Sequence, residues 1–203
     1  MYFSMHPPSM SPLLLAVIGL LLGLSLAAPP GPVTAVMVDR SLRSSTGGIL
    51  VGLGAMTADF ILMIATFTVK QFLLLDSLIP FVYLSGAAFF AILAYMVAFH
   101  GSSDPQPNSH GYTTGLFMGL SNPFQIGWWL TAGLAFNQKF GILPFYFLFL
   151  GIIVWISFLS VAVHFSVVKY GERAREILRG FSSITLAFFA VLFAAYFYLS
   201  IMP

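Results

Sequence analysis

The chain has 203 residues, of which 59% are hydrophobic and only 7% are charged, with a formal net charge of +2. Soluble domains carry roughly 25% charged residues, so this sequence predicts an all-α membrane protein whose main solvent is lipid. The absence of cysteine excludes disulfides and thiolate chemistry, and the small positive charge is no footprint for nucleic acid, because the basic residues lie mainly in predicted loops.

A membrane-spanning helix needs about 20 mostly apolar residues, and six stretches qualify. The first starts at Ser11 and runs into the proline cluster at 29–32. No Lys or Arg precedes Arg40, so we expect this run to be a retained helix rather than a cleaved signal peptide. The other five stretches are 47–69, 78–99, 112–136, 142–168 and 181–201.

The polar segment 100–111, rich in Pro, Ser and Gly, lies at the midpoint and predicts a flexible linker. Residues 1–203 then form a single transporter domain made of two half-repeats, 11–99 and 112–201. Three spans per half place the halves in opposite orientations, the inverted repeat common in secondary transporters. The charged segment 169–180 predicts a solvated helical turn between the last two spans, which attracts anionic headgroups.

Prolines interrupt the first span of each half, in both cases after a Gly-Leu-Ser sequence. Pro30, Gly31 and Pro32 predict the end of one helix and the start of another, and Asn122-Pro123 predicts the same in the fourth span. Free amides near Val33 at the new helix N-terminus favour an anionic group such as a substrate carboxylate. The alternative is that both prolines only kink helix ends near the membrane surface.

Asp59 is the only carboxylate deep inside a predicted span. A charged Asp at the bilayer centre costs about 2.5–3.5 kcal/mol, so it should face the bundle interior. Gly48, Gly52 and Ala55 recur with it on one helix face, a stripe of small residues that packs membrane helices closely. Asp59 can bind a substrate ammonium, a proton, or each in turn, and the alternative is a structural hydrogen bond to a neighbouring helix.

Loop charges predict the orientation. The loops after the first, third and fifth spans hold six Lys and Arg, against two in the loops after the second and fourth. The positive-inside rule then places both termini on the extracytoplasmic side of a multi-pass plasma-membrane protein. Trp128 and Trp129 fall inside a predicted span rather than at an interface, so we expect one of them to line a cavity.

The motifs together resemble the lysine-exporter (LysE/RhtB) family of amino-acid translocators. The resemblance rests on Ala-Ala-Pro-Pro-Gly-Pro at 27–32, the basic turn at 40–43, the glycine-rich second helix ending in Asp59, and the Asn-Pro motif at 122–123. The aromatic residues downstream of that motif are closer to the form associated with archaeal members. Two positions depart from the family pattern: Val33 stands where Asn or Asp is frequent, and Phe124 where Lys is frequent.

The resemblance implies six helices and the proton-driven export of amino acids or related zwitterions, without a cofactor. The two departures remove polarity and favour a small neutral or hydrophobic substrate over a basic one. A divalent-cation permease of related architecture is the alternative, although hard cations need several oxygen ligands and no metal-binding set is evident. A membrane enzyme is not expected, because no cluster of catalytic side chains lies inside the spans. Association into a homo-oligomer stays open.

Overall fold

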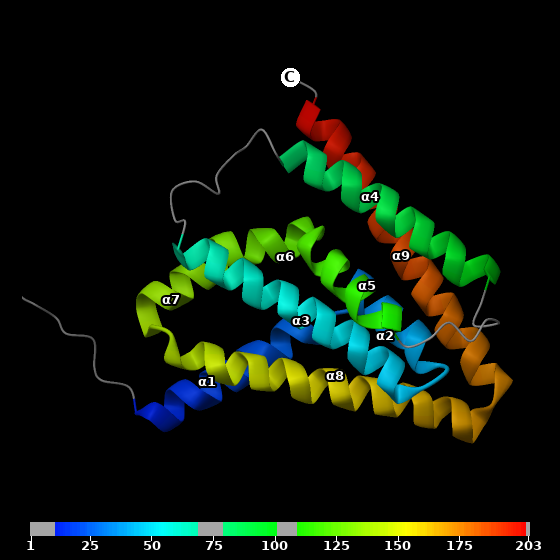
Figure 1. Ribbon diagram of the computed structural model, residues 1–203, viewed down its shortest axis with the longest axis horizontal. Helices are drawn as coiled ribbons and strands as arrows, with labels where there is room; N and C mark the ends of the chain where they lie inside the picture. The colour runs from blue at the N-terminus through cyan, green and yellow to red at the C-terminus, as the bar shows by residue number, and fades with distance from the viewer. Residues whose placement is uncertain (1–10, 69–78, 101–108, 202–203) are drawn as a thin grey trace, which may run out of the picture.

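The computed structural model describes residues 11–68, 79–100 and 109–201, and every regular element within these ranges is helical (Figure 1). The first part of the chain forms α1 (Pro12–Ala27), α2 (Pro32–Ser41), α3 (Ser45–Thr68), α4 (Ile79–Tyr95) and a π-helical turn, η2 (Met96–His100). The second part forms α5 (Ser109–Leu120), α6 (Pro123–Trp128), a π-helical turn η4 (Trp129–Gly133), α7 (Leu134–Phe140), α8 (Leu143–Tyr170) and α9 (Glu172–Ile201).

The helices pack most closely in three pairs: α1 with α8, α3 with α5, and α4 with α9 (Figure 1). Glycine makes the first two approaches possible. A Cβ atom at Gly23 of α1 would collide with the backbone of Leu148 on α8, and one at Gly54 of α3 would collide with the backbone of Tyr112 on α5. Backbones this close gain the van der Waals contact that holds membrane helices together.

The short helix α2 lies inside the molecule and packs against α3, α8 and α9. Four consecutive residues, 35–38, are each at most 3% exposed. The body of α2 is therefore covered by protein, whereas Pro29 and Pro30 in the break before it are exposed.

The outer surface is apolar. On α8, for example, Phe158 and Phe165 are each 62% exposed, and helices that are apolar on every face belong in lipid. By length and composition α3, α8 and α9 can each cross a membrane, and α1 with α2 can form a fourth, bent span. The protein is thus an all-helical membrane protein, whereas the count of six spans and the inverted repeat stay predictions.

The segment 169–180, expected as a solvated helical turn between the last two spans, is helical but does not form a separate connection. Helix α8 continues to Tyr170, and α9 begins at Glu172, nine residues before the expected span. Gly171 alone makes the turn, with a φ of +64°, a left-handed conformation that glycine adopts without steric cost. Lys169 lies in the last turn of α8, and the other charged residues of this segment lie on the first turns of α9.

The expected linker 100–111 is also shorter than predicted, because His100 belongs to η2 and residues 109–111 belong to α5. The rest of that linker, 101–108, lies outside the described residues. So do Val69 and Leu78, the predicted ends of the second and third spans, and the loop charge at Lys70.

Candidate functional site

The proline cluster at 29–32 breaks the first span. Helix α1 ends at Ala27, α2 starts at Pro32, and the two axes differ by 79°. The first backbone hydrogen bond of α2 joins the Ala35 N–H to the Gly31 carbonyl at 2.9 Å. Gly31, at the N-cap position, has no side chain to accept a bond, so the N–H groups of Val33 and Thr34 have no acceptor within the helix.

Asn122-Pro123 makes the second break. Helix α5 ends at Leu120 and α6 starts at Pro123. The Asn122 side chain is the N-cap, and its Oδ1 accepts the Phe124 N–H at 3.1 Å. This helix start is therefore satisfied by its own sequence, in contrast to the start of α2.

Asp59 lies on α3 between the two breaks and is 8% exposed. The indole Nε1–H of Trp129, which is fully buried at the start of η4, donates to Asp59 Oδ1 at 2.7 Å. On the neighbouring turn, Gln125 Nε2 donates to the carbonyl of Ala55 at 3.3 Å. Two side chains of the second half thus contact the same stretch of α3, 70 residues away in sequence.

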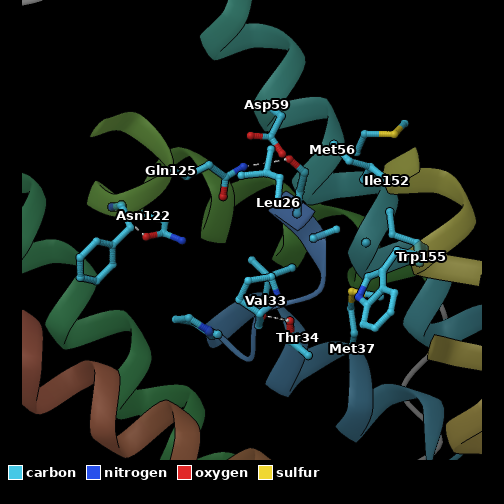
Figure 2. Close-up of a pocket in the computed structure, with 18 of the residues that line it drawn as sticks. Leu26, Val33, Thr34, Met37, Met56, Asp59, Asn122, Gln125, Ile152 and Trp155 are labelled. Carbon is cyan, nitrogen blue, oxygen red and sulfur yellow. Dashed lines mark hydrogen bonds between the residues drawn. The ribbon is translucent and has the colours of Figure 1, made fainter. Parts of the chain in front are cut away.

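These elements enclose a cavity of about 280 Å³. Figure 2 shows Asp59 on one side of it and Val33 with Thr34 on the other. The walls are otherwise mainly apolar and include Met37, Met56 and Trp155. Small-molecule sites usually measure about 300–1,000 Å³, so this cavity has the size for a small solute.

The structure brings together most of the predicted site residues. The cavity is lined by Gly31, Pro32, Val33, Asp59 and Asn122, together with Gly52 and Ala55 of the small-residue stripe. Two other predicted residues, Pro30 and Pro123, are absent from the lining set, although each flanks a residue that belongs to it.

The small-residue stripe splits into two parts. Gly48 lies away from the cavity, where an added Cβ would meet the hydroxyls of Ser41 and Ser160. Gly52 faces the side chain of Ile156 on α8 and also lines the cavity, as does Ala55. Close helix packing and access to the cavity therefore share one face of α3.

One of the two tryptophans was predicted to line a cavity, and Trp128 does so. The partner of Asp59, Trp129, was not singled out for that contact, and neither was Gln125. The sequence offered one indication of these contacts, namely that two tryptophans lie inside a predicted span. Trp129 also starts a π-helical turn, which no local sequence pattern indicated.

Asp59 is the only charged residue among those that line the cavity. In the low dielectric of a buried site its carboxylate attracts a cationic group more strongly than it would in water. Within the described residues, no group of three or more His, Cys, Asp or Glu side chains is arranged to hold a metal ion. His164 lies outside the cavity, with its Nδ1 3.2 Å from the carbonyl oxygen of Ser41.

Residues 24–196 match the family described as LysE type translocator. The chain belongs to this family. It is also similar to a Bacillus subtilis (strain 168) protein named "Putative amino acid efflux protein YcgF", with 27% identity over 195 residues that cover 86% of this chain and 92% of the relative. No solved structure matches the chain. The matched range contains both helix breaks, Asp59 and Trp129, so the cavity is part of the translocator domain.

Proposed function

We propose that this translocator exports amino acids or related small zwitterions across the plasma membrane, driven by the proton motive force. One observation carries the proposal: a single carboxylate, Asp59, faces the uncapped N-terminus of α2 across a small, mainly apolar cavity. A zwitterion needs such a pair of opposite partners. Membership of the translocator family and similarity to an amino acid efflux protein support the same conclusion.

In the proposed binding mode the substrate ammonium lies against Asp59, and the substrate carboxylate accepts the N–H groups of Val33 and Thr34. The positive end of the α2 dipole favours the carboxylate there. The start of α6 is less suited to this role than the sequence suggested, because Asn122 already occupies the Phe124 N–H. Asn122 instead offers its remaining amide atoms to the cavity.

We propose a neutral side chain for the substrate. Beyond Asp59, the described residues that line the cavity include no carboxylate for a basic side chain and no cation for an acidic one. Met37, Met56 and Ile152 offer an apolar wall instead. A buried charge without a partner is strongly unfavourable, so lysine and glutamate should bind worse than leucine or valine.

For the transport cycle we propose two inverted half-repeats of three spans each, which rock about the cavity and expose it alternately to the two sides. Asp59 exchanges the substrate ammonium for a proton and so couples efflux to the proton gradient. Both termini are extracytoplasmic in this arrangement, as the loop charges predict.

The alternative, a divalent-cation permease, has less support. Divalent cations such as Ca²⁺ take six to eight oxygen ligands, and within the part of the chain that the structure describes Asp59 is the only carboxylate that lines the cavity. Loaded vesicles separate the two functions, because amino acids alter efflux from an exporter of zwitterions whereas divalent ions alter efflux from a cation permease.

The test is uptake into inverted vesicles, or export from amino-acid-loaded cells that make the protein, across the twenty amino acids. We expect proton-dependent export of neutral amino acids, and we expect Asp59→Asn to abolish it while the protein still inserts into the membrane. Glu176→Gln, which removes an exposed carboxylate from α9, is the matched control and should export like the wild type. Normal export by Asp59→Asn would overturn the proposed role of Asp59.

A further inference from the structure

The hydrogen bond from Trp129 to Asp59 involves one of the two carboxylate oxygens. We propose that Trp129 is a positioning residue: its indole N–H holds Asp59 Oδ1, which leaves Oδ2 as the carboxylate oxygen presented to the cationic group of the substrate. This inference rests on the proposed function and concerns how the Asp59 carboxylate of the same site is oriented.

The geometry gives Asp59 one strong internal partner. The Nε1 to Oδ1 distance is 2.7 Å, at the short end for a bond between N–H and a carboxylate. Asp59 Oδ1 therefore has a fixed donor in the empty site. Asp59 is nevertheless a lining residue of the cavity.

The indole itself is held rigidly. Its ring lies near-parallel to that of Phe149, with centroids 6.4 Å apart, and packs against Phe145 at 5.8 Å. Phe67 of α3 contacts the ring edge-on at 6.2 Å. An aromatic cluster on α3 and α8 thus fixes the direction in which the N–H points.

The backbone beneath Trp129 is also specialised. Trp129 begins the π-helical turn η4, and such turns often mark functional sites. Across this turn a Cβ at Gly133 would lie 2.9 Å from Trp129 Cε3, so glycine gives the indole its room. Consecutive residues on a helix point about 100° apart, and Trp128 lines the cavity while Trp129 is bonded to Asp59.

The first test compares binding of L-leucine to purified wild-type protein, Trp129→Phe and Phe145→Leu. Trp129→Phe removes the donor and keeps an aromatic ring, whereas Phe145→Leu loosens the same cluster and keeps the donor. A hydrogen bond to a charged group contributes about ten- to a hundredfold in affinity, so we expect at least a tenfold weaker affinity for Trp129→Phe. Phe145→Leu should weaken the affinity less than Trp129→Phe does, because the N–H donor remains and Phe67 and Phe149 still pack against the indole.

Two further measurements separate positioning from packing. In an Asp59→Ala background, Trp129→Phe should add no further loss of leucine affinity, because the pair acts as a unit. If Trp129→Phe does not fold, 3-benzothienylalanine at position 129 replaces the indole N–H by sulfur with nearly unchanged shape and should give the same loss. The indole N–H signal of Trp129 in an NMR spectrum of the ¹⁵N-tryptophan-labelled protein should shift in Asp59→Ala.

Wild-type affinity in the benzothienylalanine protein, or equal losses in Trp129→Phe and Phe145→Leu, would overturn the proposal. A wild-type protein that binds and exports no amino acid would instead overturn the proposed function. In that case the indole N–H signal still tests the hydrogen bond itself, so the two failures are distinguishable.

Discussion

At the scale of single residues, Gly31 and Asn122 occupy the same position in two helices. Each is the N-cap before a helix-starting proline. Asn122 caps its own helix through Oδ1, whereas Gly31 has no side chain and leaves two N–H groups of α2 unoccupied. One amide side chain caps the start of α6, and no side chain caps the start of α2, which is why the proposed function assigns the substrate carboxylate to α2.

Gly31→Ser tests this difference. The N-cap φ is −155°, which any residue adopts, and a Cβ there meets nothing within 4 Å. A serine hydroxyl would accept the Val33 or Thr34 N–H and raise stability by about a few tenths of a kcal/mol over glycine. It would also compete with the substrate carboxylate, so we expect a slightly higher Tm together with about tenfold weaker amino-acid binding.

Gly31→Ala is the matched control, because it adds the same Cβ without an acceptor. Its affinity should stay close to that of the wild type, and its Tm should not rise above that of Gly31→Ser. Unchanged affinity in Gly31→Ser, with the raised Tm that shows a formed cap, would contradict the role assigned to the start of α2.

At the scale of helices, the sequence allowed both breaks to be placed, because proline acts locally on its own helix. The start of α9 was missed for the opposite reason. Residues 172–179 are charged and lower the hydropathy, yet Glu, Arg, Ala and Leu favour helix, and a single glycine is enough to turn the chain. The contact between Asp59 and Trp129 spans 70 residues, so only the packed fold shows it.

Replacing glycine by alanine should have opposite effects on stability at two positions, one in a close helix contact and one outside it. Gly23→Ala places a Cβ into the backbone of Leu148, and overpacking of this kind costs about 1–3 kcal/mol. Gly180 lies inside α9 with nothing within 4 Å of an added Cβ, so Gly180→Ala should stabilise the protein by about 0.5–1 kcal/mol.

Thermal unfolding in detergent measures both changes in stability. About 1 kcal/mol corresponds to roughly 2–4 °C for a chain of this size, so the two variants should move the Tm in opposite directions. A Tm for Gly23→Ala at or above that of Gly180→Ala would argue against the close approach of α1 and α8.

At the scale of the whole molecule, the apolar composition correctly predicted a membrane protein. The number of spans does not follow from composition, because it also depends on how the shorter and broken helices are counted. Loop charges remain the basis for orientation. The described structure places four arginine and lysine residues at the junction of α8 and α9: Lys169, Arg173, Arg175 and Arg179. Under the positive-inside rule, their common location is the strongest basis for the proposed orientation.

Cysteine labelling tests that orientation in a chain that has no native cysteine. We expect Glu176→Cys, on α9, to react with a membrane-impermeant maleimide only after cells are opened. Lys139→Cys, which is exposed near the end of α7, should react in intact cells. The reverse pattern would place the termini in the cytoplasm and invert the proposed topology.

The difference between the N-termini of α2 and α6 also has a consequence for the stereochemistry of the substrate. Under the proposed function, the substrate ammonium, carboxylate and side chain each have a different partner: Asp59, the start of α2, and an apolar wall. Three unlike contacts around one tetrahedral carbon distinguish mirror images. The cavity is therefore a chiral selector, and exchanging two substituents of the α-carbon would direct the side chain of a D-amino acid away from the wall that receives it.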